Sequence, residues 1–511
     1  MSGPFSPNAA GRPAARSSLH ARRAPCIALV AALFVAPARA QTVTIAPETD
    51  AAAAVAAAPA GTAFVFAPGV HRLAAPIVPK DGDSFAGRPG AVLSGAAPLS
   101  GFVREGAFWV LARAFAETGG HGACRRAADG TGRIACRFAE ELFVDGAPAP
   151  RAESAEDVDA AGWHLDAGRG RLVLGFDPAG RTVELAAAPA AFAGPARGVA
   201  IRGLVVERFA NPAQRGAIQG MESESWTVEG NVVRFNHGLG IRVGPRMRVT
   251  GNRVHDNGQL GIGGNGNDVV VEGNAIVGNN RLGFDPEWEA GGAKFVLTHR
   301  LVLRGNCVAG NGGSGLWTDI NADDTLVEGN VVVGNANAGI QHEIGGRTVI
   351  RGNLAAFNGR AKDVWLWGAQ ILVQNSRDTV VEDNTVVVAA DGGAGIALVH
   401  QRRLDGYGNP ALTVRNTVRG NRIVYLGGDG RSGAVADADP DVLLGGGNVF
   451  AANRYVGVDP GRAAWAWGGR MLAWADFRAA GHEAGGSLAS GVAAALAPVD
   501  GALSGRCAAP G

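Results

Sequence analysis

The chain has 511 residues, and its 47 Lys and Arg residues nearly balance its 46 Asp and Glu residues. Without the first 40 residues, 42 basic residues stand against 46 acidic ones, so the net charge is about −4. Because phosphate binding needs a basic surface, this balance argues against nucleic acid as a partner. Glycine supplies 78 residues, which favours a backbone of many tight corners.

The first 40 residues have the pattern of a secretory signal peptide. Arg22 and Arg23 precede an apolar run over residues 24–35, and the small residues Ala38 and Ala40 stand where a signal peptidase reads. We therefore expect export, with cleavage after Ala40, to a secreted or periplasmic location. The apolar run is too short to cross a bilayer stably and no later stretch qualifies, so we expect no membrane span.

The next 150 or so residues divide into two parts by pattern. Residues 41–100 contain short apolar runs that end in turn residues, which predicts an N-terminal cap and the first coils of a larger fold. Residues 101–192 alternate instead like antiparallel strands joined by Asp and Gly turns, as in 143–146 and 171–175. This second part predicts a small β-rich insertion.

Cysteine usage fits an exported chain. Cys124 and Cys136 flank a short loop of the expected insertion, which predicts a local disulfide. A bridge from Cys307 to Cys507 would tie the C-terminal segment back onto the fold. The sequence has no Cys-x-x-Cys or Cys/His spacing of a metal site, so no metal ligands and no cofactor are expected, with structural calcium left open.

A four-residue phrase recurs eight times between residues 228 and 424: an apolar residue, a polar residue, Gly or Asp, and Asn. The phrase ends at Asn231, Asn252, Asn274, Asn306, Asn330, Asn353, Asn384 and Asn421. Successive Asn positions differ by 21, 22, 32, 24, 23, 31 and 37, so a unit of about 22 residues recurs and three units carry insertions. A period of this length predicts a solenoid.

The residues around each Asn identify the kind of solenoid. The second residue after each Asn is apolar, as at Val233 and Val308, whereas the first varies, which is strand alternation with one buried side. Stacked coils place the Asn side chains over one another as a ladder. Leucine-rich repeats need a Leu frame and a helical return that are absent. The prediction is an all-β, right-handed parallel β-helix over 193–425, with C-terminal coils and a cap over 426–511.

Two acidic residues stand out among the outward positions of the coils. The segments 315–319 and 339–343 align by their corner Gly, so Leu316 and Ile340 point inward while Asp319 and Glu343 point outward. The same alternation predicts that His342 points inward, as a hydrogen-bonded core residue rather than a base. The two acids are one coil apart, and neighbouring parallel strands lie about 4.8 Å apart. Carboxylates this close raise the pKa of one of them, an arrangement suited to acid/base or nucleophilic chemistry on a sugar. The alternative is a pair of solvated surface acids.

The neighbours of the pair favour a functional site. Lys294 is predicted one coil before Trp317 on the same outward column, and Gln341 one coil after. Inserted segments on either side supply further candidates, and we expect their tryptophans, together with Trp317, to be exposed as a platform for sugar rings. The candidates are Trp288, Glu289, Trp365, Trp367 and Gln374.

Over about residues 43–460 the chain resembles the pectin-lyase-like superfamily of secreted right-handed parallel β-helix proteins. The segments WEAGGAK at 288–294, GLWTD at 315–319, GIQHEI at 339–344 and WLWGA at 365–369 carry the narrower resemblance, to bacterial β-helix repeat proteins. The chain is also similar to β-helix glycoside hydrolases, including a β-xylosidase type with an Asp and a Glu on neighbouring coils and a β-sandwich insertion. This resemblance implies glycosidase chemistry. Asp285-Pro286-Glu287 is similar to the Asp-Pro-His of mannuronan epimerases, with Glu287 in place of His.

These observations lead to a hypothesis of a glycoside hydrolase acting on a polysaccharide or oligosaccharide. Asp319 attacks or stabilises the anomeric carbon, Glu343 protonates the leaving oxygen, and Glu289 supports the pair. The expected substrate-binding residues are Lys294, Trp317, Gln341, Trp365, Trp367, Gln374 and Trp288. A polysaccharide lyase or epimerase and a non-catalytic glycan-binding or structural solenoid remain alternatives. We expect a monomer.

Overall fold

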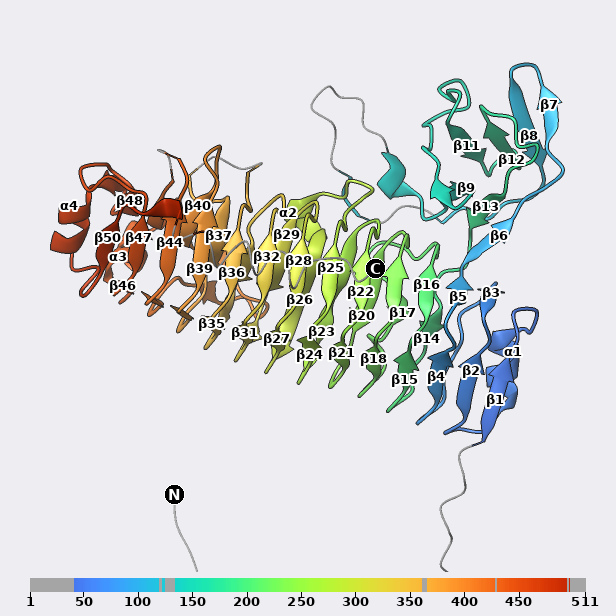
Figure 1. Cartoon of the computed structure of the whole chain (residues 1–511), viewed down its shortest axis with the longest axis horizontal. Helices are drawn as coiled ribbons and strands as arrows, with labels where there is room; N and C mark the ends of the chain where they lie inside the picture. The colour runs from blue at the N-terminus through green and yellow to red at the C-terminus, as the bar shows by residue number, and fades with distance from the viewer. Residues whose placement is uncertain are drawn as a thin grey trace, which may run out of the picture. The chain divides into compact units, whose positions relative to one another are not determined.

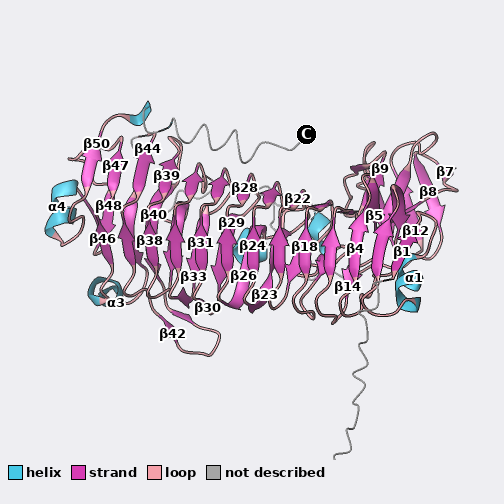
Figure 2. Cartoon of the chain, turned by 60° about the horizontal axis from the view of Figure 1, so that its bottom comes forward, coloured by secondary structure: helices cyan, strands magenta, loops and turns pink. Residues whose placement is uncertain are grey.

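In the described part of the chain, most strands belong to three long sheets that lie side by side along one axis (Figure 1, Figure 2). The computed structural model describes residues 41–118, 122–124, 134–360, 365–427, 430–493 and 496. From residue 192 to residue 467 each coil contributes one strand to each sheet in turn, and strands of successive coils pair in parallel, as β29 (Ser314–Asp319) pairs with β33 (Ile340–Glu343). The predicted parallel β-helix is therefore confirmed.

The first sheet, sheet A, is built from the strands that precede each repeated Asn. In spatial order it contains β1 (Thr42–Ile45), β2 (Ala63–Phe66), β4 (Ser84–Gly87), β15 (Ala200–Arg202), β18 (Thr227–Glu229), β21 (Arg248–Thr250), β24 (Val270–Glu272), β27 (Val302–Arg304), β31 (Leu326–Glu328), β35 (Val349–Arg351), β38 (Val380–Glu382), β43 (Thr417–Arg419) and β46 (Val449–Ala451).

Sheet B holds the strands that follow each repeated Asn. It contains β3 (Gly69–Arg72), β5 (Ala91–Ser94), β16 (Val205–Glu207), β19 (Val232–Arg234), β22 (Arg253–His255), β25 (Ala275–Val277), β28 (Cys307–Ala309), β32 (Val331–Val333), β36 (Leu354–Ala356), β39 (Thr385–Val388), β44 (Arg422–Tyr425), β47 (Arg454–Val456) and β50 (Ser487–Ala489).

Sheet C contains the longer strands that carry the candidate site. It is formed by β14 (Phe192–Ala193), β17 (Gly216–Gln219), β20 (Leu239–Val243), β23 (Leu260–Asn267), β26 (Gly291–His299), β29 (Ser314–Asp319), β33 (Ile340–Glu343), β37 (Ala369–Gln374), β40 (Ala394–His400), β45 (Ser432–Ala436), β48 (Trp465–Trp467) and β49 (Arg470–Leu472). Two short strands pair beside this path, β30 (Ala322–Asp323) and β34 (Gly345–Gly346).

The repeated Asn residues form the predicted ladder between sheets A and B. Asn330 Oδ1 accepts hydrogen bonds from both the backbone and the side-chain nitrogen of Asn306, each at 2.9 Å. Asn330 Nδ2 in turn donates to Asn353 Oδ1 at 2.9 Å and to a backbone carbonyl. Because the amides are buried, each rung satisfies polar groups that water cannot reach.

The residue before each ladder Asn makes the corner. At Gly230 φ is +64°, and no atom lies within 4 Å of the place where a Cβ would stand, so backbone conformation rather than space favours Gly. In the seventh copy Asp383 takes the same corner at φ +54°. Asp tolerates this conformation better than most residues, which explains why the phrase reads Gly or Asp.

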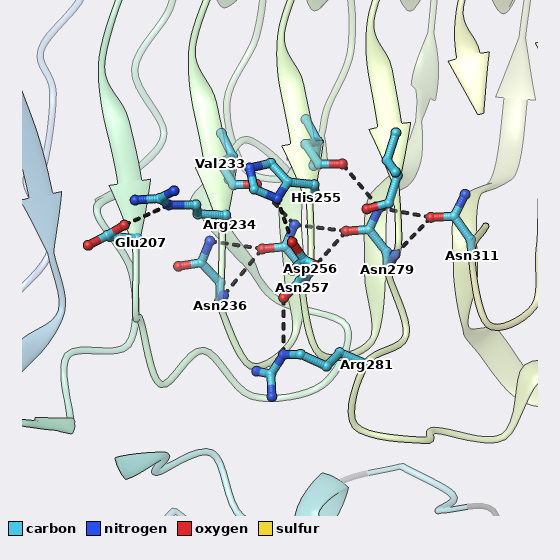
Figure 3. A network of polar contacts seen from close by, with 12 residues as sticks. Glu207, Val233, Arg234, Asn236, His255, Asp256, Asn257, Asn279, Arg281 and Asn311 are labelled. Carbon is cyan, nitrogen blue, oxygen red and sulfur yellow. Dashed lines mark hydrogen bonds and ion pairs between the residues drawn. The ribbon is translucent and has the colours of Figure 1, made fainter. Parts of the chain in front are cut away.

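A second ladder of Asn side chains runs between sheets B and C (Figure 3). Asn236, Asn257, Asn279 and Asn311 are bonded amide to amide in turn, and beyond them the Asn residues of the ladder continue through Asn335 to Asn358. There the next rung is Gln370, whose Oε1 accepts from Asn358 Nδ2 at 2.8 Å. Gln370 lies only 12 residues further along the chain, so its longer side chain keeps the ladder paired beside an enlarged corner.

The ends of the coil stack are covered by helices. At the first coil, α1 (Ala51–Ala57) begins at Asp50, whose side chain accepts from Ala53 N, and it buries Val55 in the core. At the last coil, α4 (Trp474–Ala479) packs Phe477 against Trp465 and Phe450. The first ladder stops there, because Glu483 accepts hydrogen bonds from the backbone and side chain of Asn453. Helices packed at the two ends cover apolar side chains of the terminal coils and so disfavour end-to-end association.

The insertion folds as two small antiparallel sheets with an apolar cluster of their own. Its elements are β6 (Ala96–Pro98), β7 (Val103–Glu105), β8 (Phe108–Ala112), η1 (Ile134–Arg137), β9 (Leu142–Val144), β10 (Ala147–Pro148), β11 (Trp163–Asp166), β12 (Arg171–Leu174) and β13 (Val183–Ala186). Ion pairs join it to the coils, including Arg281 to Glu141 at 2.6 Å. The remaining elements are α2 (Pro286–Glu289), α3 (Pro440–Gly445) and a hairpin of β41 (Arg403–Leu404) and β42 (Pro410–Ala411).

The predicted disulfide between Cys124 and Cys136 is confirmed, with Cα atoms 5.8 Å apart. Cys307 is also disulfide-bonded. Its expected partner, Cys507, lies outside the described residues, as does the predicted signal peptide at 1–40. No helix in the described part of the chain has the length and apolar character needed to span a membrane.

Candidate functional site

The acidic pair lies on adjacent strands of sheet C in the predicted register. Leu316 pairs with Ile340 and both are buried in the core, while Trp317 pairs with Gln341. Alternation then turns Asp319 and Glu343, two residues further on, to the outward side. His342, between these columns, points inward as predicted, where Thr318 Oγ1 bonds its Nδ1 at 2.8 Å. Burial lowers the pKa of His342 to about 3, so it stays neutral.

Lys294 reaches the pair from the preceding strand, β26. It pairs in register with Trp317, and its Nζ lies 2.9 Å from Asp319 Oδ2. The same ammonium sits 3.4 Å from the Trp317 ring centroid and donates to the Trp288 carbonyl oxygen at 3.1 Å. The ion pair, the cation–π contact and the hydrogen bond together fix Asp319 and Trp317 relative to each other.

Glu343 has a different environment from Asp319. Its Oε2 accepts from Gln341 Nε2 at 3.1 Å, and its Oε1 lies 3.0 Å from Arg403 Nη1. Burial and the nearby charge of Asp319 raise the pKa of Glu343 to about 7, against the opposing effects of Arg403 and Lys294. A carboxyl with this pKa holds a proton for part of the time at neutral pH.

The exposure predicted for the central residues is wrong. Trp317 is only 5% exposed, and Lys294, Asp319 and Glu343 are 7%, 4% and 3% exposed. Two inserted segments account for the difference, because the α2 segment contacts Lys294 from one side and the β41 strand contacts Glu343 from the other. The carboxylates are therefore covered rather than set in an open surface.

Trp288 and Glu289 both belong to α2 but serve different contacts. Trp288 is partly buried and contributes its backbone carbonyl to Lys294. Glu289 turns away from the acidic pair, because its carboxylate accepts from Gln214 at 2.7 Å and lies 3.7 Å from Arg242. The helix starts at Asp285, whose side chain accepts from the backbone of Glu287, so the Asp-Pro-Glu sequence serves as a helix cap.

The remaining predicted residues lie on the C-terminal side of the pair. Gln374 pairs in register with Glu343, and its Nε2 donates to Gln401 at 2.9 Å. Trp365 and Trp367 have ring centroids 6.0 Å apart and pack on an apolar outward patch of β37 and β40 that includes Leu372. Leu372 is the register partner of Gln341, so the two tryptophans border the site rather than lie over it.

A family model described as a right-handed beta helix region matches residues 216–386. The chain is a right-handed parallel β-helix protein. Among solved structures, XylC in complex with xylose resembles it with a TM-score of 0.63 and 14% identity, covering 88% of this chain and 86% of that one. At this identity the likeness shows the fold alone.

Weaker likenesses extend to other solved β-helices. The Azotobacter vinelandii mannuronan C-5 epimerase AlgE4 A-module has a TM-score of 0.42 and 15% identity, covering 75% of this chain and 91% of that one. A structure described as a glycoside hydrolase has a TM-score of 0.36 and 9% identity, covering 88% of this chain and 96% of that one. None of the curated proteins matches the sequence.

Arg403 contacts Glu343 but is not among the site residues that we predicted from the sequence. It stands 60 positions after Glu343 in the chain and belongs to a hairpin inserted between β40 and β43. The signal that marks it is the spacing of 37 between Asn384 and Asn421, the longest in the repeat series. Such an insertion locates a loop but does not say which coil the loop reaches.

The described residues of the β-helix contain no group of three or more His, Cys, Asp or Glu side chains arranged to hold a metal ion.

Proposed function

We propose that the protein is a glycoside hydrolase in which Asp319 and Glu343 act as paired carboxylates. The observation that carries the proposal is the contrast between two covered acids on adjacent coils: Asp319 is ion-paired with Lys294 at 2.9 Å, whereas Glu343 has a pKa raised to about 7. Hydrolysis of a glycosidic bond needs one carboxylate and one carboxylic acid across the scissile bond.

The two environments support a division of roles. Asp319 is fixed by Lys294 and by a hydrogen bond from the backbone of Ile320 at 2.8 Å, so it is suited to attack or stabilise the anomeric carbon. Glu343 holds a proton near neutral pH and is suited to protonate the leaving oxygen. Because adjacent parallel strands lie about 4.8 Å apart, the expected spacing favours retention of configuration over inversion.

Nearby polar atoms supply contacts for sugar hydroxyls. Within the described residues, Trp317 Nε1 and Gln374 Oε1 are buried and have no hydrogen-bond partner. Buried polar atoms left without partners are costly, and a hydroxylated ligand satisfies both a donor and an acceptor. The xylose named in the similar XylC structure supports a sugar as the ligand class.

We also propose that the protein acts outside the cytoplasm. The Cys124–Cys136 bond supports this, because disulfides persist in oxidising compartments. Removal of residues 1–40 during export is part of the same proposal. N-terminal sequencing of the exported protein tests it, with Gln41 as the expected first residue.

The decisive test combines a substrate screen with amide variants of the two acids. The parent protein is assayed for reducing ends and for unsaturated products over a panel of polysaccharides and nitrophenyl glycosides. Asp319→Asn and Glu343→Gln preserve shape but remove the nucleophile and the proton donor, so each should lower the hydrolysis rate by about 10²–10⁴-fold. Both variants should still bind the substrate.

A matched control is Glu328→Gln on sheet A, which removes an ion-paired carboxylate far along the coil from the site. It should hydrolyse at the parent rate. Parent-like hydrolysis by both amide variants would refute the assignment. Unsaturated products would instead favour a lyase, and sugar binding without any product would favour a glycan-binding solenoid.

A further inference from the structure

The β41–β42 hairpin forms an arm that hydrogen bonds hold in a defined position. It leaves sheet C after β40 and reaches back along the coils, so that Gly406 N donates to Asn321 Oδ1 at 2.6 Å beside β30. Figure 2 shows it projecting beside β30 at the edge of the coil stack. Its tip is braced by Asp405, which accepts from the backbones of Tyr407 and Asn409 at 2.8 Å.

The base of the hairpin is also fixed. Asn375 Nδ2 donates to the backbone carbonyls of Gln401 at 2.6 Å and Ala411 at 2.8 Å, so one amide holds both legs. Asn375 follows Gln374 at the end of β37, next to the acidic pair. Hydrogen bonds at the base and at the tip hold the arm in place over β33 and β37.

The arm brings a charge to the proton donor. Arg403 Nη1 lies 3.0 Å from Glu343 Oε1, and the arginine side chain is 42% exposed. The other charged groups that act on Glu343 are Asp319 from β29 and Lys294 from β26. Lys294 is already paired with Asp319, so Arg403 is the direct cationic partner of Glu343.

The arm also carries an apolar surface that continues from the site. Tyr407 is 80% exposed and Leu404 is 59% exposed. The arm tip lies against Ile320, since a Cβ on Gly406 would stand 3.1 Å from the Ile320 side chain. Ile320 directly follows Asp319, and its backbone bonds the Asp319 carboxylate. Exposed apolar residues gathered beside a site are typical of ligand contacts.

We propose that this hairpin is a substrate-binding arm, in which Arg403 is a positioning residue for Glu343 and the apolar surface of Tyr407, Leu404 and Ile320 receives the sugar ring on the leaving-group side. The inference rests on the proposed hydrolase function and adds the part of the site that selects the leaving group. Aromatic rings bind the apolar faces of sugars while the hydroxyl edges take hydrogen bonds from a guanidinium.

The arrangement couples binding to protonation. In the free protein, Arg403 stabilises the ionised form of Glu343 and so lowers the fraction of Glu343 that carries a proton near neutral pH. When a sugar on the arm takes the guanidinium as its hydrogen-bond donor, Glu343 loses this partner. It then takes up a proton from solvent and can deliver that proton to the glycosidic oxygen as the bond to the anomeric carbon breaks.

The first test replaces Arg403 and follows the pH dependence of kcat/KM. Arg403→Met should move the high-pH limb upward by about one pH unit, because a neighbouring opposite charge lowers a carboxyl pKa by about 1–3 and this one is partly exposed. Arg403→Lys should keep the limb near its parent position. The matched control is Arg402→Met, since Arg402 is 77% exposed and pairs with Asp439 instead.

The second test asks what the apolar surface binds. Tyr407→Ala should raise KM for the disaccharide of the best substrate by about two- to tenfold, in line with the loss of one aromatic contact. KM for the corresponding nitrophenyl monosaccharide should change less, and Tyr407→Phe should restore the parent values. Leu444→Ala, an exposed apolar residue on α3, serves as the control.

A readout without substrate separates this inference from the proposed function. The melting temperatures of the parent and of Glu343→Gln are compared across pH 4–9, and the comparison is repeated with Arg403→Met in both. In both pairs the curves should begin to separate near pH 4.5, the ordinary pKa of a Glu, and the pH at which the separation levels off should rise with Arg403→Met. If it stays in place, Arg403 does not govern Glu343, whatever the enzyme assays show.

Two results would contradict the proposed sugar-binding surface of the arm. A disaccharide KM that is unchanged in Tyr407→Ala overturns it, and so does a substrate panel without any hydrolysis. In that last case the proposed function also fails, while the melting comparison still decides the role of Arg403.

Discussion

Sheets A and C both place glutamates on the outside of the same coils, yet the two sets differ in chemistry. On sheet A, Glu328 lies between Arg304 at 3.0 Å and Arg351 at 2.7 Å, and hydrogen bonds from both guanidinium groups lower its pKa. On sheet C, Glu343 is covered, and burial with the charge of Asp319 raises its pKa to about 7.

The difference comes from what surrounds each strand and not from the residue type. On sheet A, arginines of neighbouring coils alternate with the glutamates and water reaches both, so each carboxylate is paired and screened. On sheet C, two inserted segments cover the outward face, so a carboxylate there loses water and meets a second acid. An outward acid of a solenoid thus becomes chemically useful when another segment covers it.

The largest expected difference between Glu343 and Glu328 is in their effect on the pH dependence of activity. If Glu343 is the proton donor, kcat/KM should fall by about tenfold per pH unit above a pH near 7, as Glu343 loses its proton. Rate profiles from pH 5 to 9 on the substrate found by the panel give the measurement. Glu328→Gln should leave the profile unchanged, and a profile flat to pH 9 would exclude Glu343 as the donor.

Stability should also depend on pH through Glu343. Its pKa is raised on folding, so its contribution is fully present below its ordinary pKa of 4.5 and is lost as the pH rises through about 7. Relative to Glu343→Gln, the parent should lose on the order of 3 kcal/mol of unfolding free energy between pH 4 and pH 8. Denaturant unfolding at both pH values measures this, and a constant difference between the two proteins would contradict it.

A substitution at a buried position of the ladder should lower the stability more than a substitution at an outward position. Asn330→Ala removes a buried rung, so the two nitrogens of Asn306 lose an acceptor and Asn353 Oδ1 loses one of its donors, which should cost about 1–3 kcal/mol. Arg253→Ala, at an outward position of β22, should be near neutral. Melting temperatures of the two variants give the comparison, and equal shifts would refute the assignment of faces.

The smallest expected effect is on sheet A. Glu328→Gln removes two partly exposed ion pairs, and pairs of this kind contribute less than about 1 kcal/mol each. Chemical denaturation at low and high salt measures the change, which should shrink further at high salt. A loss as large as that of Asn330→Ala would mean that the Arg and Glu residues of sheet A stabilise the coils as much as the ladder does.

The coil register could be predicted from the sequence because the repeated Asn and the corner Gly mark equivalent positions in successive coils. Asn spacing placed the ladder, and the corner Gly placed Lys294, Trp317 and Gln341 on one column, as the structure has them. The inward position of His342 followed from the same alternation. These features are local to one coil or repeat with it, so pattern alone determines them.

The cover of the site could not be predicted in this way. Trp317 was expected to be exposed, but the α2 segment and the hairpin enclose its neighbours. Both segments are insertions without a period, and contacts such as that of Arg403 with Glu343 depend on where a loop returns in space. The orientation of Glu289 toward Arg242 was missed for the same reason.

The rung formed by Gln370 affects how far the sequence and length of this corner can vary. Asn358 needs an amide at the next level, and Gln370 supplies it from 12 residues along the chain instead of from a full coil later. The coils can therefore accept an inserted segment at this corner without losing the hydrogen bonds of the Asn ladder. Segments at such corners can diversify, or be exchanged by an engineer, while the stack beneath them keeps its geometry.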